Sequence, residues 1–155
     1  KEQQWAQKGV VALSGLMFIA GFVVAGLDFR FGWSKMPAVV TVVASVLFLV
    51  AYALYAEVMR ENAYLSRTVK VEEGQTVVDT GLYGIVRHPM YTATLLMFLA
   101  MPLILGSLWG GAIFAVYPVL IIKRIQNEEQ VLSIGLKGYT DYQQRVRWRL
   151  IPWVW

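Results

Sequence analysis

The sequence predicts an all-α, polytopic integral membrane protein. We expect two full transmembrane helices, a short transmembrane helical hairpin and a cytoplasmic amphipathic C-terminal helix. Of its 155 residues, 57% are hydrophobic and only 15% are charged, whereas soluble domains average about 25% charged residues. Three long runs carry no charge, and the charged residues gather at their ends. A surface of this composition is suited to lipid.

The first two uncharged runs have the length of membrane spans. Residues 9–27 and 36–56 lack charged side chains, and a helix needs about 20 apolar residues to cross a bilayer. The first run contains Gly15, Gly21 and Gly26. Small residues in membrane helices allow close approach of a neighbouring helix, so we expect all three glycines at helix contacts.

The third run, residues 89–122, is too long for one span and too short for two. As a single helix it would measure about 51 Å, against a hydrocarbon core of about 30 Å. Its centre reads Gly-Ser-Leu-Trp-Gly-Gly, which is a turn composition. We therefore predict a hairpin of two shortish helices, roughly 90–105 and 109–124, kinked at Pro102 and Pro118.

The polar segments indicate the orientation. Residues 57–88 are expected to form a short loop or strand-like segment, and the charged tail after residue 122 a helix broken near Gly135 and Gly138. The N-terminal end, residues 57–88 and the tail hold 12 of the 14 basic residues, so the positive-inside rule places them in the cytoplasm. The chain begins with Lys1 rather than Met, which leaves two interpretations open: a naturally short protein, or a chain trimmed at its N-terminus.

Two absences limit the chemistry. The chain has no cysteine and a single histidine, His88, which excludes disulfides, thiolate metal sites and multi-histidine metal sites within one chain. We therefore expect no metal. The net charge of +4 lies beside apolar runs, which fits an anionic membrane face better than nucleic acid. The lipid bilayer is the expected partner.

The segment around His88 is the first candidate site. Pro89 suits the first turn of a helix, which places Arg87 and His88 beside free N–H groups and the positive end of a helix dipole. Such a position favours a carboxylate or phosphate, and Tyr91 lies within one turn. The plainer interpretation is an Arg-His pair at the lipid headgroups, and spacing alone leaves both open.

The exit of the third run is the second candidate site. Arg124 and Glu128 are four residues apart and share one helix face. They could form an ordinary exposed ion pair. Alternatively, Glu128 faces a cationic ligand and Arg124 an anionic acceptor, since charges at the end of an apolar helix are functional candidates.

Aromatic and polar residues near these clusters could complete the site. The tyrosines that could form a wall for a cationic ligand are Tyr83, Tyr91, Tyr139 and Tyr142. Aromatic residues at a membrane interface are also common anchors. Asn62 and Arg67 could reach the same site, although a solvated surface is the plainer interpretation for both.

Four strings of the C-terminal two thirds resemble the isoprenylcysteine carboxyl methyltransferase family and related membrane phospholipid methyltransferases. They are GLYGIVRHPMYTA (81–93), RIQNEEQVL (124–132), GLKGYTDY (135–142) and RVRWRLIP (145–152). The segment ENAYLSRTVKVEEGQTVVDTG (61–81) is similar to the one that prokaryotic relatives carry before the RHP motif. The family often has glycine where this chain has Ala93, which is a small-for-small change.

The resemblance implies one membrane methyltransferase domain over residues 1–155, with two transmembrane helices in 1–56 and the cofactor-binding and catalytic region in 57–155. It implies S-adenosyl-L-methionine as cofactor, with S-adenosyl-L-homocysteine as product, and Arg124 as the catalytic, substrate-facing arginine. We add Asn62 as a substrate-binding candidate. The implied cofactor contacts are Gln75, Thr76, Val77, Val78, Tyr83, His88, Pro89, Met90, Tyr91 and Glu128.

The predicted activity is methyl transfer to a lipophilic acceptor at the cytoplasmic membrane face. A carboxylate of isoprenylcysteine type is the first choice, because an ionised carboxylate needs no general base. A phospholipid amine is the alternative and requires a base, for which His88 or Tyr91 would have to be available. The third possibility is a membrane scaffold that keeps the fold without catalysis.

Overall fold

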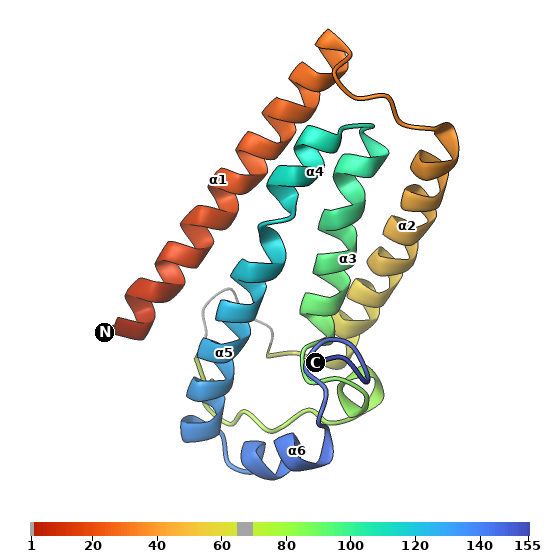
Figure 1. Cartoon of the computed structure of the whole chain (residues 1–155). Coiled ribbons are helices and arrows are strands. Elements are labelled where there is room, and N and C mark those ends of the chain that lie inside the picture. The colour runs from red at the N-terminus through yellow and green to blue at the C-terminus, as the bar shows by residue number, and fades with distance from the viewer. Residues whose placement is uncertain (1, 65–69) are drawn as a thin grey trace.

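The computed structural model describes residues 2–64 and 70–155, with side chains from Lys8 onward, and all regular structure in those ranges is helical (Figure 1). Arg67, which sequence reasoning linked to the site, lies outside the described residues. The elements are α1 (Glu2–Phe31), α2 (Ala38–Glu61), the short 3-10 helix η1 (Gly81–Gly84), α3 (Pro89–Ile104), α4 (Leu108–Phe114), α5 (Tyr117–Gly135) and α6 (Tyr139–Arg145).

Three helical stretches in the described ranges are long and apolar enough to cross a membrane. They are Lys8–Phe31, Ala38–Glu61 and Leu108–Gly135, and α3 is a shorter apolar helix. The prediction of a membrane-spanning helical protein is therefore supported. α2 packs along α3, whereas α1 packs against α4 and α5, so the hairpin lies between the first two spans (Figure 1).

The hairpin differs from the prediction in its second arm. The first arm, α3, ends at Ile104 as expected, but the second continues through the charged residues to Gly135 and is interrupted after Phe114. Pro118 lies in the first turn of α5 and has no N–H to continue the ladder from α4. It therefore divides the arm into two helices. Pro102 lies inside α3, as predicted.

The tail and the polar loop follow the prediction in outline. α5 ends at Gly135, and Gly138, with a φ of 85°, precedes α6. Residues 70–80 form a loop with a turn closed by a hydrogen bond from Gln75 N to Glu72 O, so the described part of the 57–88 segment has no strand. After Arg145 the chain is not helical. It folds back onto the start of α3, where the backbone N–H of Arg87 donates to Trp148 O at 2.9 Å.

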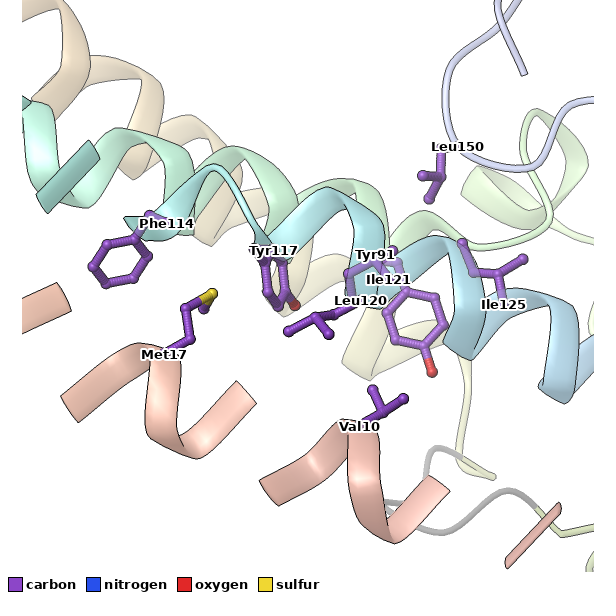
Figure 2. Packing of buried hydrophobic residues seen from close by; sticks show 9 residues of the cluster. All are labelled: Val10, Met17, Tyr91, Phe114, Tyr117, Leu120, Ile121, Ile125 and Leu150. Carbon is purple, nitrogen blue, oxygen red and sulfur yellow. The ribbon is translucent and has the colours of Figure 1, made fainter. Parts of the chain in front are cut away.

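The largest apolar core lies where α1 meets α4 and α5. Figure 2 shows Val10 and Met17 of α1 facing residues of those helices, with Tyr91 of α3 beside them. The cluster consists of Val10, Met17, Tyr91, Phe114, Tyr117, Leu120, Ile121, Ile125 and Leu150. The cluster extends to the cavity described below, because Tyr91 belongs to both the core and the cavity lining.

The glycines of α1 do not all lie at contacts. A Cβ at Gly21 would overlap the ring of Phe114, as expected for a close helix contact. Gly15 and Gly26 would each meet open space, so their predicted packing role is wrong within this chain. Both glycines lie on parts of the helix surface that α4 and α5 leave uncovered.

Replacing Gly21 with leucine should destabilise the bundle, because the Phe114 ring occupies the required space. Overpacking a filled contact costs about 1–3 kcal/mol. Gly15→Leu is the matched control, because it makes the same chemical change on the same helix without meeting a neighbour. Thermal unfolding in detergent, followed by circular dichroism, should show a lower Tm for Gly21→Leu alone. Equal shifts for both variants would refute the close contact.

A buried acid fixes the far end of the bundle. Asp28, 1% exposed, accepts hydrogen bonds from the Ser34 backbone N–H at 2.6 Å, the Ser34 hydroxyl at 2.7 Å and the Ser107 hydroxyl at 2.5 Å. Ser107 also caps α4, because its Oγ accepts from Gly110 N. This network joins α1, the following loop and the hairpin tip. The predicted first span ended at Leu27 and gave Asp28 no role, whereas α1 continues through Asp28 to Phe31.

Candidate functional site

A polar cavity lies at the end of the bundle opposite Asp28. It encloses about 780 Å³ of space between atoms, including its open mouth. Its walls come from the end of α2, the 70–80 loop, η1, the start of α3, α5 and α6. Segments more than 60 residues apart in the sequence therefore meet at one place.

The cavity collects most of the predicted site residues. Those that line it are Asn62, Gln75, Thr76, Val77, Val78, Tyr83, His88, Met90, Tyr91 and Glu128. Pro89 does not line the cavity and is the buried first residue of α3. Arg124 does not line the cavity and faces a neighbouring groove. Asn62, predicted as a substrate contact, lines the cavity and not the groove that Arg124 lines.

The four predicted tyrosines line the cavity together. The hydroxyl of Tyr142 donates to Tyr83 O at 2.7 Å, and Asn62 Nδ2 donates to the hydroxyl of Tyr83 at 2.9 Å. Burial raises the pKa of Tyr83 to about 12, and burial likewise raises the pKa of Tyr139 and Tyr142 well above the usual range of a phenol. All three therefore present neutral rings and hydroxyls at physiological pH.

A buried ion-pair cluster underlies the cavity. Glu129 Oε1 accepts from Arg87 Nε at 2.7 Å and lies 3.1 Å from His88 Nε2, and Glu129 Oε2 accepts from Arg149 Nε at 2.9 Å. The side chains of Arg87 and Glu129 are only 7% and 6% exposed. A buried charge needs such a partner to avoid a large desolvation cost. Glu129 therefore joins α5 to the α3 start and the tail.

This cluster corrects the expected role of Arg87. Its guanidinium is already engaged within the protein, because its Nη1 donates to Val146 O at 2.7 Å and to Arg147 O at 2.9 Å. Arg87 still borders the cavity, but its hydrogen bonds hold the tail. Glu129 and Arg149 were missed by sequence reasoning. The second glutamate of RIQNEEQVL was the available signal, since it is adjacent to the selected Glu128.

Tyr91 connects the two predicted charges. Its hydroxyl donates to Glu128 Oε2 at 2.6 Å and accepts from Arg124 Nε at 2.7 Å. Arg124 and Glu128 share a face of α5, as predicted, but Tyr91 lies between them in the network. This arrangement replaces the alternative of an ordinary exposed ion pair.

An apolar groove adjoins the polar cavity. It encloses about 1070 Å³, including its opening, and is lined by side chains of α1, α2, α3 and α5. Arg124 lies in its wall, and Met90 and Tyr91 line both spaces. Among the residues that the structure describes, only these two belong to both linings, so the cavity and the groove adjoin at the start of α3.

The fold and the site define a class: a helical membrane protein with a polar cavity beside an apolar groove. Residues 37–136 match the phospholipid methyltransferase family. That match covers more than half of the chain, and the chain belongs to this family. The family indicates a membrane methyltransferase but does not fix its acceptor. The expected family relationship is supported in this coarser form.

The chain is also similar to part of a protein with a different named activity, a sterol reductase. The chain is 31% identical to the Delta(14)-sterol reductase of Mus musculus over 91 residues. The match covers 57% of this chain and 22% of the reductase. The similarity therefore concerns a small part of that relative.

Proposed function

We propose that the protein transfers a methyl group from S-adenosyl-L-methionine to a lipophilic carboxylate. The observation that carries this proposal is the shared wall at Met90 and Tyr91, where a polar cavity meets an apolar groove. The family match supports methyl transfer. The proposed acceptor is of isoprenylcysteine type, and the proposed location of the site is the cytoplasmic membrane face.

The cavity residues suit the cofactor chemically. Glu128 places a carboxylate among aromatic rings, and carboxylates and aromatic faces both attract a sulfonium cation. The polar Gln75–Val78 segment and Asn62 offer hydrogen-bonding groups for the rest of the molecule. When bound, S-adenosyl-L-methionine supplies an electrophilic methyl group.

The groove residues suit an acceptor with a carboxylate and an apolar tail. Arg124 pairs with the carboxylate, since a guanidinium can bind both of its oxygens. The carboxylate oxygen attacks the methyl carbon, and a C–O bond forms as the C–S bond breaks. No proton is transferred, so the protein contributes orientation and exclusion of water.

An amine acceptor would make a further demand on the site. An amine acceptor needs a base to remove its proton. The two candidate bases are both engaged with carboxylates, His88 with Glu129 and Tyr91 with Glu128. A carboxylate acceptor avoids this requirement. A lipid-extract assay with labelled cofactor tests the choice, because it reports whether base-stable amines or base-labile esters are formed.

Cofactor binding is the first test of the proposed function. Isothermal calorimetry with S-adenosyl-L-homocysteine on detergent-purified protein should show saturable binding, and Glu128→Ala should weaken it about tenfold or more, the loss expected for a contact to a charged group. Glu73→Ala is the control, because Glu73 is an exposed acid outside the cavity. Absence of binding by the unmodified protein at millimolar ligand would favour the non-catalytic scaffold.

A further inference from the structure

The apolar groove has a polar end and an aromatic end. At the polar end, Arg124 and Tyr91 are joined by a hydrogen bond. At the other end, Phe18 of α1 and Phe98 of α3 face each other with ring centroids 4.6 Å apart and perpendicular planes. Both phenylalanines line the groove. One end can therefore hold a charged headgroup and the other only hydrocarbon.

A second apolar hollow begins beyond these rings. It is lined by Phe22 of α1, residues of α2 that include Phe48, and the C-terminal half of α3 from Met101. Phe18 and Phe22 lie one helical turn apart, with centroids 6.2 Å apart. The Phe18–Phe98 pair, called here the aromatic partition, thus lies between two apolar spaces along the same face of α3.

Neighbouring rings hold the aromatic partition in place. Phe18 contacts Phe114 edge to face at 5.5 Å, and Phe98 contacts Tyr117 at 4.8 Å. Phe114 is fully buried, and Tyr117 donates a hydrogen bond to Thr94 Oγ1 at 3.0 Å. Such edge-to-face contacts each stabilise an arrangement beyond simple burial. The partition therefore has a fixed position along α3.

We propose that the aromatic partition limits the length of hydrocarbon chain that the groove can bury. This inference rests on the proposed function, and it specifies the acceptor as a single-chain amphiphile with its anionic headgroup at Arg124. Tyr91 and Phe98 are seven residues apart on α3, which corresponds to about 11 Å along the helix axis. A chain longer than this distance meets the two rings.

The occupant follows from the chemistry of the walls. Apart from Arg124, the polar side chains of the lining are hydroxyls, and those of Ser14, Thr94 and Tyr117 each donate to a protein oxygen. Val11 and Met59 of the lining are 52% and 50% exposed on helices long enough to span a membrane. A hydrocarbon chain can therefore enter from the bilayer.

A chain-length series tests the inference. N-acetyl-S-alkyl cysteines from hexyl to hexadecyl are compared for binding, by calorimetry in detergent, and for methyl transfer from labelled cofactor. Affinity and kcat/KM should rise about fourfold for each added methylene while the chain fills the groove, and the rise should stop at the partition. Phe98→Ala and Phe18→Ala should each move that break to longer chains, because they open the path to the second hollow.

Controls separate the possible failures. Phe29→Ala, at an 86% exposed position near the other end of α1, should keep the break where it is in the unmodified protein. A continuous rise in the unmodified protein, or an unmoved break in both partition variants that still bind S-adenosyl-L-homocysteine, would overturn the length limit. A break in affinity without methyl transfer to any acceptor would support the length limit and contradict the proposed function.

Discussion

Replacing Glu129 with alanine is expected to cause the largest loss of stability among single substitutions at the site. The variant leaves Arg87 buried without its carboxylate partner and removes the link to Arg149. Breaking one side of a buried ion pair costs about 3–5 kcal/mol. Thermal unfolding in detergent should show a much lower Tm, and binding of S-adenosyl-L-homocysteine should be lost, because His88 borders the cavity.

Glu57 provides the matched control for this prediction. It pairs with Arg60 on the surface of α2, where the arginine side chain is 75% exposed. Exposed pairs contribute only about 0–1 kcal/mol, so Glu57→Ala should leave Tm nearly unchanged. Similar shifts for Glu57→Ala and Glu129→Ala would mean that the buried cluster does not hold the site together.

Replacing Arg124 with alanine is expected to cause the largest loss of methyl transfer with the fold preserved. Arg124 lies in the groove wall and donates to Tyr91, so its loss removes the charge proposed to bind the acceptor carboxylate. Truncating one partner of a partly buried charge contact costs about 2–5 kcal/mol, which corresponds to a fall in kcat/KM of about 30-fold or more. A labelled-methyl assay with a prenylcysteine analogue measures this fall.

Two comparisons make the Arg124 result specific. Lys123→Ala removes a neighbouring exposed charge from α5 and should leave turnover unchanged. Binding of S-adenosyl-L-homocysteine should survive in Arg124→Ala, because Arg124 does not line the cavity. Undiminished turnover by Arg124→Ala on every accepted substrate would exclude the proposed role of this residue.

The membrane helices could be predicted because their signal is local. An uncharged run marks a span directly. α1 contains the whole first run with extra turns at both ends, whereas α2 begins at Ala38, two residues inside the second run, and continues past its end to Glu61. The second arm of the hairpin was predicted too short. Its helix continues into charged residues because Ile125 and Glu129 are buried against the rest of the protein. This burial cannot be seen in the sequence, where the uncharged run simply ends.

The cavity lining was predicted better than the network behind it. Residue type and spacing left Tyr83 and His88 open between a site and a membrane anchor, and the family resemblance selected them. The structure brings them together in one lining. The partners of Arg87 could not be selected, since they lie on α5 and the tail, 42 to 60 residues away. Pairing across such distances depends on tertiary packing, and one sequence carries no direct signal for it.

The contacts between Arg87 and the tail have a consequence for the order in which the protein matures. During synthesis the chain emerges from its N-terminal end, so the RHP segment is made about 60 residues before the carbonyls of Val146 and Arg147 that it binds. The spans can enter the membrane before those residues exist. The polar cavity is therefore expected to be the last part to form, and a ribosome-bound chain that stops short of Val146 should be inserted in the bilayer but unable to bind S-adenosyl-L-homocysteine.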